Sequence, residues 1–204
     1  MRDYWTHLSL SVSVDPATEP VTPREVAKHA RVETDVEDAA LRMMAKSARQ
    51  AVEGMIGRAL ITQTLVVTFP GWPEGGGVQD AVMRLPMAAP LGAVSTVQYY
   101  SAANVLTTWG AANYNVESEA EPALISRAYG VTWPTLRARY APVRVTYTAG
   151  YGTSPEDVPE ALRLAICAYA AGLYEFRESH LEGAFELRVN SAVSNLLRGY
   201  MVSM

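Results

Sequence analysis

The sequence predicts an α+β fold: a mainly helical core of two long helices plus short ones, with an inserted antiparallel β-sheet of about five to seven short strands. Two observations indicate this class. Apolar residues recur at three- and four-residue steps near both ends of the chain, which is the period of a helix. The middle of the chain instead holds short β-branched and aromatic runs divided by Pro, Gly and Asn, with connections short enough for antiparallel pairing.

The composition is that of one globular domain. Of 204 residues, 49% are hydrophobic and 19% are charged, which is far from the composition of disordered chains. The 17 basic and 21 acidic side chains give a net charge of -4, and no run of Lys or Arg suggests sequence-reading DNA binding. Such a surface is still compatible with DNA moving past it. Cys167 is the single cysteine and lies in an apolar run, so we expect a buried thiol and no disulfide.

The first segment, residues 1–18, is expected to be an arm. Its stretch "LSLSVSV" alternates like a strand but has no adjacent partner, so we expect it to pair with something else. The start is a poor signal peptide, and no stretch is long and apolar enough for a membrane helix, so we expect synthesis in the cytoplasm and no membrane partner. Thr22, Pro23 and Glu25 then form a capping box that opens a helix over 23–30.

A long amphipathic helix is predicted over 36–56, followed by the β region at 60–149 and a second long helix over 159–177. We assign residues 19–180 to one domain. The remaining residues, 181–204, are expected to form a tail with a short helix near its end.

The stretch "TAGYGTSPED" has the strand, glycine turn and helix order of a phosphate-binding loop, but it lacks the required chemistry. No Lys follows Gly150 or Gly152, and Glu156, Asp157 and Glu160 would repel a phosphate at the helix N-terminus. We therefore expect a strand-to-helix turn with an acidic cap.

No other pattern predicts an active site. Gly75, Gly76 and Gly77 lack a Lys and read as a mobile loop. The three histidines lack metal-ligand spacing, and no Ser lies in a nucleophile elbow. We expect no catalytic, cofactor-binding or metal-binding residues, and no enzyme activity.

Aromatic side chains lie on the expected arm, loop and tail, where they suit protein interfaces as anchors. They also suit a second role, folding back on their own core, and the sequence leaves both open. These residues are Tyr4, Trp5, Trp72, Phe185 and Tyr200.

Several stretches in order resemble phage head–tail connector proteins. They are "EPVTPREVAKHARV", "SARQAVEGMIGRALITQT", "MRLPMAAPLGAVSTVQYY", "YNVES", "VRVTYTAGYG", "VPEALRLAICAYAAGLYEFRE" and "AVSNLLRGY". The resemblance covers about residues 19–200, and its specificity lies in many weak matches that keep their order and spacing. Residues 1–18 lie outside it. The ending "RGYMVSM" also departs from the "PYR"-like ending of many relatives.

The resemblance implies a structural adaptor of tailed phages or gene transfer agents. Such proteins assemble in the bacterial cytoplasm as a ring, usually of twelve copies, that joins the portal at the capsid vertex to the stopper and tail while DNA passes through the centre. It implies that the two long helices pack side by side within and between subunits. It also implies portal docking by the tail, through Phe185, Leu187, Leu196, Leu197 and Tyr200. The loop at 71–78 would face the stopper or tail, through Trp72, Gly75, Gly76 and Gly77.

Two alternatives stay open. One is a tail-completion or stopper protein of the same particle, which differs in the neighbour that it contacts. The other is a small ligand-binding domain or enzyme that uses the turn from Gly150 to Asp157.

Overall fold

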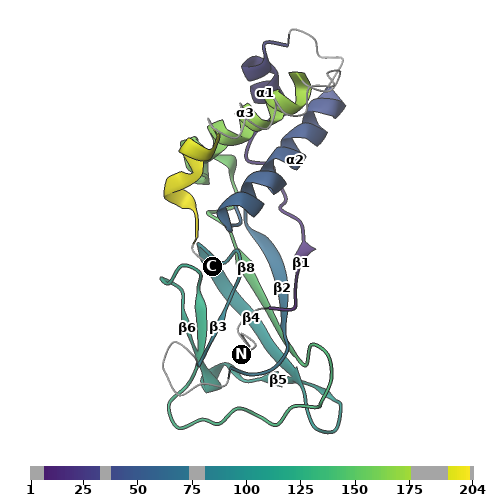
Figure 1. The fold of residues 1–204 in the computed structure, drawn as a ribbon, viewed down its shortest axis with the longest axis vertical. Coiled ribbons are helices and arrows are strands. Elements are labelled where there is room, and N and C mark those ends of the chain that lie inside the picture. Colours follow the sequence, from purple (N-terminus) through teal and green to yellow (C-terminus); the bar gives the residue numbers. More distant parts are fainter. Residues whose placement is uncertain (1–6, 33–37, 74–80, 176–192, 203–204) are drawn as a thin grey trace. The chain divides into compact units, whose positions relative to one another are not determined.

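The structure is a computed structural model that describes residues 7–32, 38–73, 81–175 and 193–202 (Figure 1). The chain forms two compact units. The sheet unit comprises Met1–Asp15, Thr62–Gly150 and Ser203–Met204, and the helical unit comprises Pro16–Ile61 and Tyr151–Val202. Each unit is described by itself below.

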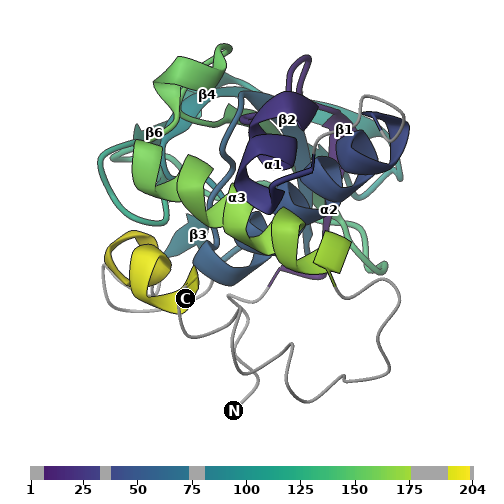
Figure 2. The same cartoon turned by 90° about the horizontal axis from the view of Figure 1, so that it is seen from above.

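The helical unit contains α1 (Pro23–Ala30), α2 (Asp38–Ile56) and α3 (Glu160–Glu175). α1 and α2 both pack against α3 (Figure 2). A further short helix over 193–197 leads into the 3-10 helix η5 (Arg198–Tyr200). The predicted capping box opens α1: the Glu25 amide donates to Thr22 Oγ1 at 3.2 Å, and the Thr22 amide donates to the Glu25 carboxylate at 2.6 Å.

The core of the helical unit is one apolar cluster, to which α1, α2, α3 and the helix at 193–197 all contribute side chains. α2 and α3 each place apolar residues on one face at helical spacing, as the sequence period predicts. The largest fully buried members include Ile56, Leu60, Ile61, Leu162 and Ile166.

Buried charges also hold the helical unit together. The Arg49 side chain is 2% exposed and donates to Glu19 and to Glu53, in each case at 2.7 Å. The Glu53 carboxylate also accepts the Leu60 amide at 2.9 Å. Burial raises the pKa of Glu53 above its ordinary value, although Arg49 and the Leu60 amide oppose this effect.

The sheet unit contains two antiparallel sheets. The five-stranded sheet has the order β1-β2-β8-β4-β5, and the three-stranded sheet has the order β3-β7-β6. Their strands are β1 (Ser9–Val14), β2 (Gln63–Phe69), β3 (Val82–Arg84), β4 (Leu91–Tyr100), β5 (Leu106–Trp109), β6 (Tyr114–Glu117), β7 (Leu124–Arg127) and β8 (Val143–Ala149). A 3-10 helix, η3 (Ala111–Asn113), joins β5 to β6.

The expected mainly helical core with an inserted sheet is wrong. Of the described residues, 34% lie in helices and 31% in strands. The reason is non-local pairing: β8, from the far end of the β region, pairs with β2 on one side and with β4 on the other. β2 and β8 bury alternate side chains, including Leu65, Val67, Val145 and Tyr147, so the sheets have a core of their own.

The stretch "LSLSVSV", for which the sequence indicated no adjacent partner, finds its partner strand within the same chain. β1 pairs antiparallel with β2, from Ser9 opposite Thr68 to Val14 opposite Thr64. The alternating pattern predicts that a segment is extended, but it does not indicate which strand it pairs with. The partner lies about fifty residues away along the chain.

Candidate functional site: an aromatic and arginine-bearing surface of the sheet unit

Five aromatic rings from separate segments of the sheet unit form a continuous cluster. Trp72, just after β2, stacks on Trp133 with ring centroids 4.7 Å apart and planes inclined by 12°. Trp72 also contacts Tyr99 and Trp109, at 5.8 and 5.2 Å, and Trp109 contacts Tyr114 at 5.6 Å. Such offset and tilted ring pairs stabilise a fold beyond the area they bury. We call these five residues the ring cluster.

The ring cluster and the backbone fix the long connection between β7 and β8. The Trp72 indole N–H donates to the Pro134 carbonyl at 2.8 Å. The Arg137 amide donates to the Tyr100 carbonyl at 3.0 Å, and the Tyr100 amide donates to the Pro142 carbonyl at 2.9 Å. A connection of this length without regular structure is usually functional when it is held in place.

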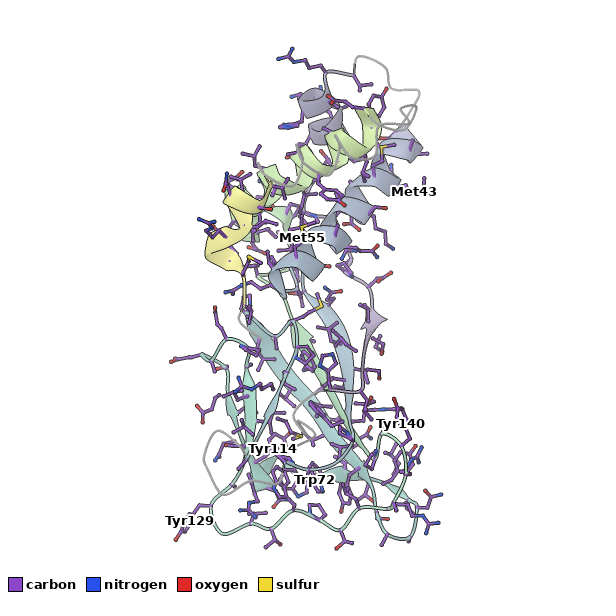
Figure 3. The ribbon with its side chains drawn as sticks, viewed as in Figure 1. Met43, Met55, Trp72, Tyr114, Tyr129 and Tyr140 are labelled. Carbon is purple, nitrogen blue, oxygen red and sulfur yellow. The ribbon has the colours of Figure 1, made fainter. Side chains whose placement is uncertain are left out.

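A groove of about 450 Å³ opens beside this connection. Aromatic, proline and arginine side chains line it, namely Pro70, Gly71, Trp72, Trp133, Pro134, Thr135, Leu136, Arg137, Ala138, Arg139 and Pro142. Next to the groove lies Tyr140, with 78% of its surface exposed. Figure 3 shows Trp72 among the strands and Tyr140 at the edge of the loops of this unit. We call the groove and Tyr140 together the groove surface.

The groove surface carries positive charge. The Arg139 guanidinium lies 3.6 Å from the centroid of the Tyr100 ring, a cation–π contact, and its Nε donates to the Tyr140 carbonyl at 3.3 Å. Arg127 lies over the Trp133 ring at 6.0 Å. The sequence from 122 to 155 contains four arginines and no acidic residue.

Two tyrosines of the sheet unit, Tyr114 and Tyr147, have a pKa above the ordinary value. Burial raises the pKa of Tyr114 and, more strongly, that of Tyr147, whose hydroxyl donates to the Pro86 carbonyl. Among the residues that the structure describes, no group of three or more His, Cys, Asp or Glu side chains could hold a metal ion. The groove surface offers aromatic rings, guanidinium groups and a hollow, which are features of binding sites.

The structure describes four of the nine residues that were expected to contact partners. Trp72 is 7% exposed and belongs to the ring cluster, so it folds back on its own core. Leu197 is 2% exposed in the core of the helical unit, and Leu196 and Tyr200 are half-buried against the same core. Arg58 Nε donates to the Tyr200 carbonyl at 2.6 Å. Phe185, Leu187, Gly75, Gly76 and Gly77 lie outside the described residues.

The sequence reasoning missed Trp133, Arg137, Arg139 and Tyr140. A signal for them was present, because arginines and aromatics are interleaved over 127–144 with no acidic residue among them. That pattern stays hidden when the charge of the whole chain is considered, because the acidic residues elsewhere outweigh it.

The glycine turn is an acid-capped turn, as the sequence predicts. Asp157 accepts the Ser154 amide at 2.9 Å, and Ser154 and Asp157 form a capping box at the 3-10 helix η4 (Pro155–Asp157). A Cβ added to Gly152 would collide with the Asp157 side chain. Gly152 thus leaves room for the Asp157 carboxylate that caps the turn.

No helix in the described part of the chain is both long and apolar enough to cross a membrane. Comparison with models of protein families gives no match. A search of curated proteins also gives none.

Solved structures do match, over 97% of this chain and 97% of each matched chain. One belongs to the neck of an empty GTA particle computed with C6 symmetry, with a TM-score of 0.74 and 26% identity. Another belongs to the virion of a native gene transfer agent (GTA) particle, with a TM-score of 0.74 and 24% identity. A third belongs to the neck of a native GTA particle computed with C12 symmetry, with a TM-score of 0.70 and 22% identity. These matches confirm the resemblance to head–tail connector proteins that the sequence predicts.

Proposed function

We propose that this chain is a structural protein of the neck of a phage-like particle and that it forms the adaptor ring there. The observation that carries the proposal is the match at 26% identity to a chain from the neck of an empty GTA particle, which covers 97% of both chains. A likeness of that extent leaves no large segment of this chain for a separate activity. It supports a structural role at the head–tail junction over a catalytic one.

The symmetry of the matched necks supports a homo-oligomeric ring. One was computed with C6 and another with C12 symmetry. A head-to-tail contact between identical subunits closes into a ring when the rotation between neighbours divides a full turn evenly. We propose twelve copies, which satisfies both symmetries.

The ring would contact the portal through residues 181–204. Leu196 and Tyr200 are half-buried, so each keeps an accessible side that a portal could cover, whereas Leu197 holds the segment to its own core. Phe185 and Leu187 remain part of the proposed docking segment. The loop at 71–78 would contact the stopper or tail, with Trp72 anchoring the loop to the ring cluster.

DNA would pass through the centre of the ring without stable binding. The net charge of -4 disfavours retention of phosphate on a surface that DNA must cross. The same chemistry fits a stopper of the same particle, so the neighbour that the chain contacts decides between the two roles.

Mass measurement of the chain alone and mixed with its portal tests the proposal. We expect a complex with about twelve copies of this chain on one portal ring. Association with a stopper or tail protein but not with the portal would indicate the stopper role instead. A chain that binds neither, but whose melting temperature rises with a small ligand, would point to a ligand-binding domain.

A further inference from the structure

The groove surface has the residue composition of a protein-binding site. Trp, Tyr and Arg are the residues that most often carry the binding energy of protein interfaces. Here Trp133, Arg137 and Arg139 line a groove of about 450 Å³, and Tyr140 stands exposed beside it. Trp133 is half-exposed and stacks on Trp72 in the ring cluster, whereas Arg137, Arg139 and Tyr140 are exposed and lie outside the core of the sheet unit.

The groove surface is held in shape before any partner arrives. The Trp72 indole bonds the Pro134 carbonyl, and the backbone on either side of the groove is bonded to Tyr100. The Arg139 guanidinium is also held in place over the Tyr100 ring, with its Cζ 3.6 Å from the ring centroid. Side chains that are ordered in advance lose little entropy on binding, so they bind more tightly for the same contact area.

The positive charge of the groove surface favours an acidic binding partner. Within the described residues, no carboxylate forms an ion pair with Arg137 or Arg139. Glu74, two residues after the groove residue Trp72, lies outside the described residues. Among the described acidic residues, those nearest to Arg137 along the chain lie in the turn that joins β6 to β7. Glu117 pairs with Leu124, whereas Tyr114 pairs with Arg127, so this turn is at the opposite end of the hairpin from Arg127.

A DNA duplex fits the groove surface less well. It carries one charge per about 1.7 Å of its axis and is usually bound by a continuous basic stripe, not by two arginines beside a groove lined by aromatic and proline side chains. A second copy of this chain exposes Glu117 and Glu119 in the β6–β7 turn, which brings no large apolar side chain, and Glu160 on α3, one helical turn before the exposed Leu164. Cross-linking distinguishes that occupant from another protein, as described below.

We propose that the groove surface binds an acidic segment of another protein, with carboxylates on Arg137 and Arg139 and an apolar side chain of the segment against Trp133. The inference deepens the proposed function, and rests on it in taking that protein to be a neighbour in the particle neck. It extends the contact proposed for the loop at 71–78 to the rest of the groove surface, which shares Gly71 and Trp72 with that loop.

A pair of peptides tests the chemistry. The full chain is titrated into a fluorescein-labelled peptide of Glu-Glu-Leu repeats and into the matched Gln-Gln-Leu peptide, with fluorescence anisotropy as the readout. We expect the Glu peptide to bind and the Gln peptide to bind at least about tenfold more weakly, and we expect added salt to weaken the Glu complex.

Charge reversal locates the binding site. Arg137→Glu should weaken binding of the Glu peptide at least about tenfold, whereas Arg24→Glu, an equal charge change on exposed α1, should alter it by less than about twofold. Arg137→Gln should give an intermediate loss. Equal binding of the two peptides, no binding of either, or equal loss in the Arg137 and Arg24 variants would overturn the inference. So would preferential binding of a labelled DNA duplex.

A photo-cross-linking amino acid in place of Tyr140, introduced into assembled particles, identifies the source of the segment. We expect attachment to an acidic segment of a different neck protein. Attachment to a second copy of this chain, to DNA or to a segment without acidic residues contradicts the inference, as does absence of attachment. If the chain enters necks normally but fails these tests, only the inference is wrong. If it binds the Glu peptide yet never enters necks, the proposed function is wrong.

Discussion

Arg49 joins two segments of the helical unit, because it reaches Glu19 before α1 and also pairs with Glu53, one turn further along its own helix α2. Glu53 in turn caps the Leu60 amide beyond the end of α2. Breaking a buried charge pair costs more than the pair contributes, since the remaining charge stays in a place that water does not reach.

We therefore expect Arg49→Leu to lower the free energy of unfolding by about 3–5 kcal/mol, measured by urea denaturation. The matched control is Arg42→Leu, in which an exposed i,i+4 pair with Asp38 is lost and about 1 kcal/mol or less is expected. Replacing Arg49 and Glu53 together by Leu should recover part of the loss. Equal effects at positions 42 and 49 would contradict the role of the buried network.

Glu25 gives the helical unit an acid-sensitive contact. Burial alone would raise its pKa, but hydrogen bonds from Thr22 and the charge of Arg163, 2.7 Å away, lower the pKa below the ordinary value of 4.5. A carboxyl whose folded pKa is lowered stabilises the fold above the unfolded pKa. That stabilisation is lost as the pH falls through the folded pKa.

We expect the wild-type chain to lose stability as the pH falls below about 4.5, and Glu25→Gln to show a smaller change over the same range. Thermal unfolding followed by circular dichroism at several pH values measures both. Glu160→Gln, which removes an exposed partner of the same arginine, serves as the control and should keep the wild-type slope. An unchanged slope in Glu25→Gln would show that this contact does not carry the acid sensitivity.

At the scale of elements, the ends of the helices were the most predictable features. The capping box at Thr22 and the acidic cap at Asp157 follow from side chains within three residues of each other, so sequence neighbours contain the needed information. The partner of β1 and the ring cluster were not predictable in this way. Trp72 and Trp133 meet although they are about sixty residues apart, and no local pattern encodes that contact.

Two glycines of the helical unit should respond oppositely to the same substitution. Gly152→Ala places a methyl group where the Asp157 side chain lies, so the cap must break and stability should fall by about 1–2 kcal/mol. Gly54→Ala lies within α2 with open space around the new Cβ, so stability should rise by up to about 1 kcal/mol. Urea denaturation checks the pair, and changes of the same sign would contradict the role of Gly152.

A test of portal docking by the segment around the helix at 193–197 needs a substitution that does not also destabilise the helical unit. Leu197→Asp would bury a charge in the core of the helical unit and should lower stability by about 3 kcal/mol or more, so loss of portal binding in that variant proves little. Met201→Asp changes a side chain that is 58% exposed. It should leave the melting temperature unchanged while weakening portal association in the mass measurement. Normal portal association in Met201→Asp would argue against docking by this end of the segment.

At the scale of the whole molecule, the sequence pointed to the right class of protein through many weak matches in order, whereas the balance of helix and sheet was misjudged. The sequence indicates an insertion because several strands are only three or four residues long, and no single strand indicates a core of its own. The order β1-β2-β8-β4-β5 brings distant strands together into a sheet with its own core. The groove surface arises from that same closure, because the β7–β8 connection is held beside Trp72 only once β8 lies between β2 and β4.

The most direct test of the central claim is a cryo-EM reconstruction of the neck of the particle that contains this chain. The account predicts a closed ring of this chain between the portal and the stopper or tail, with about twelve copies and DNA in its centre. A neck in which this chain is absent, or lies outside the path from portal to tail, would contradict it.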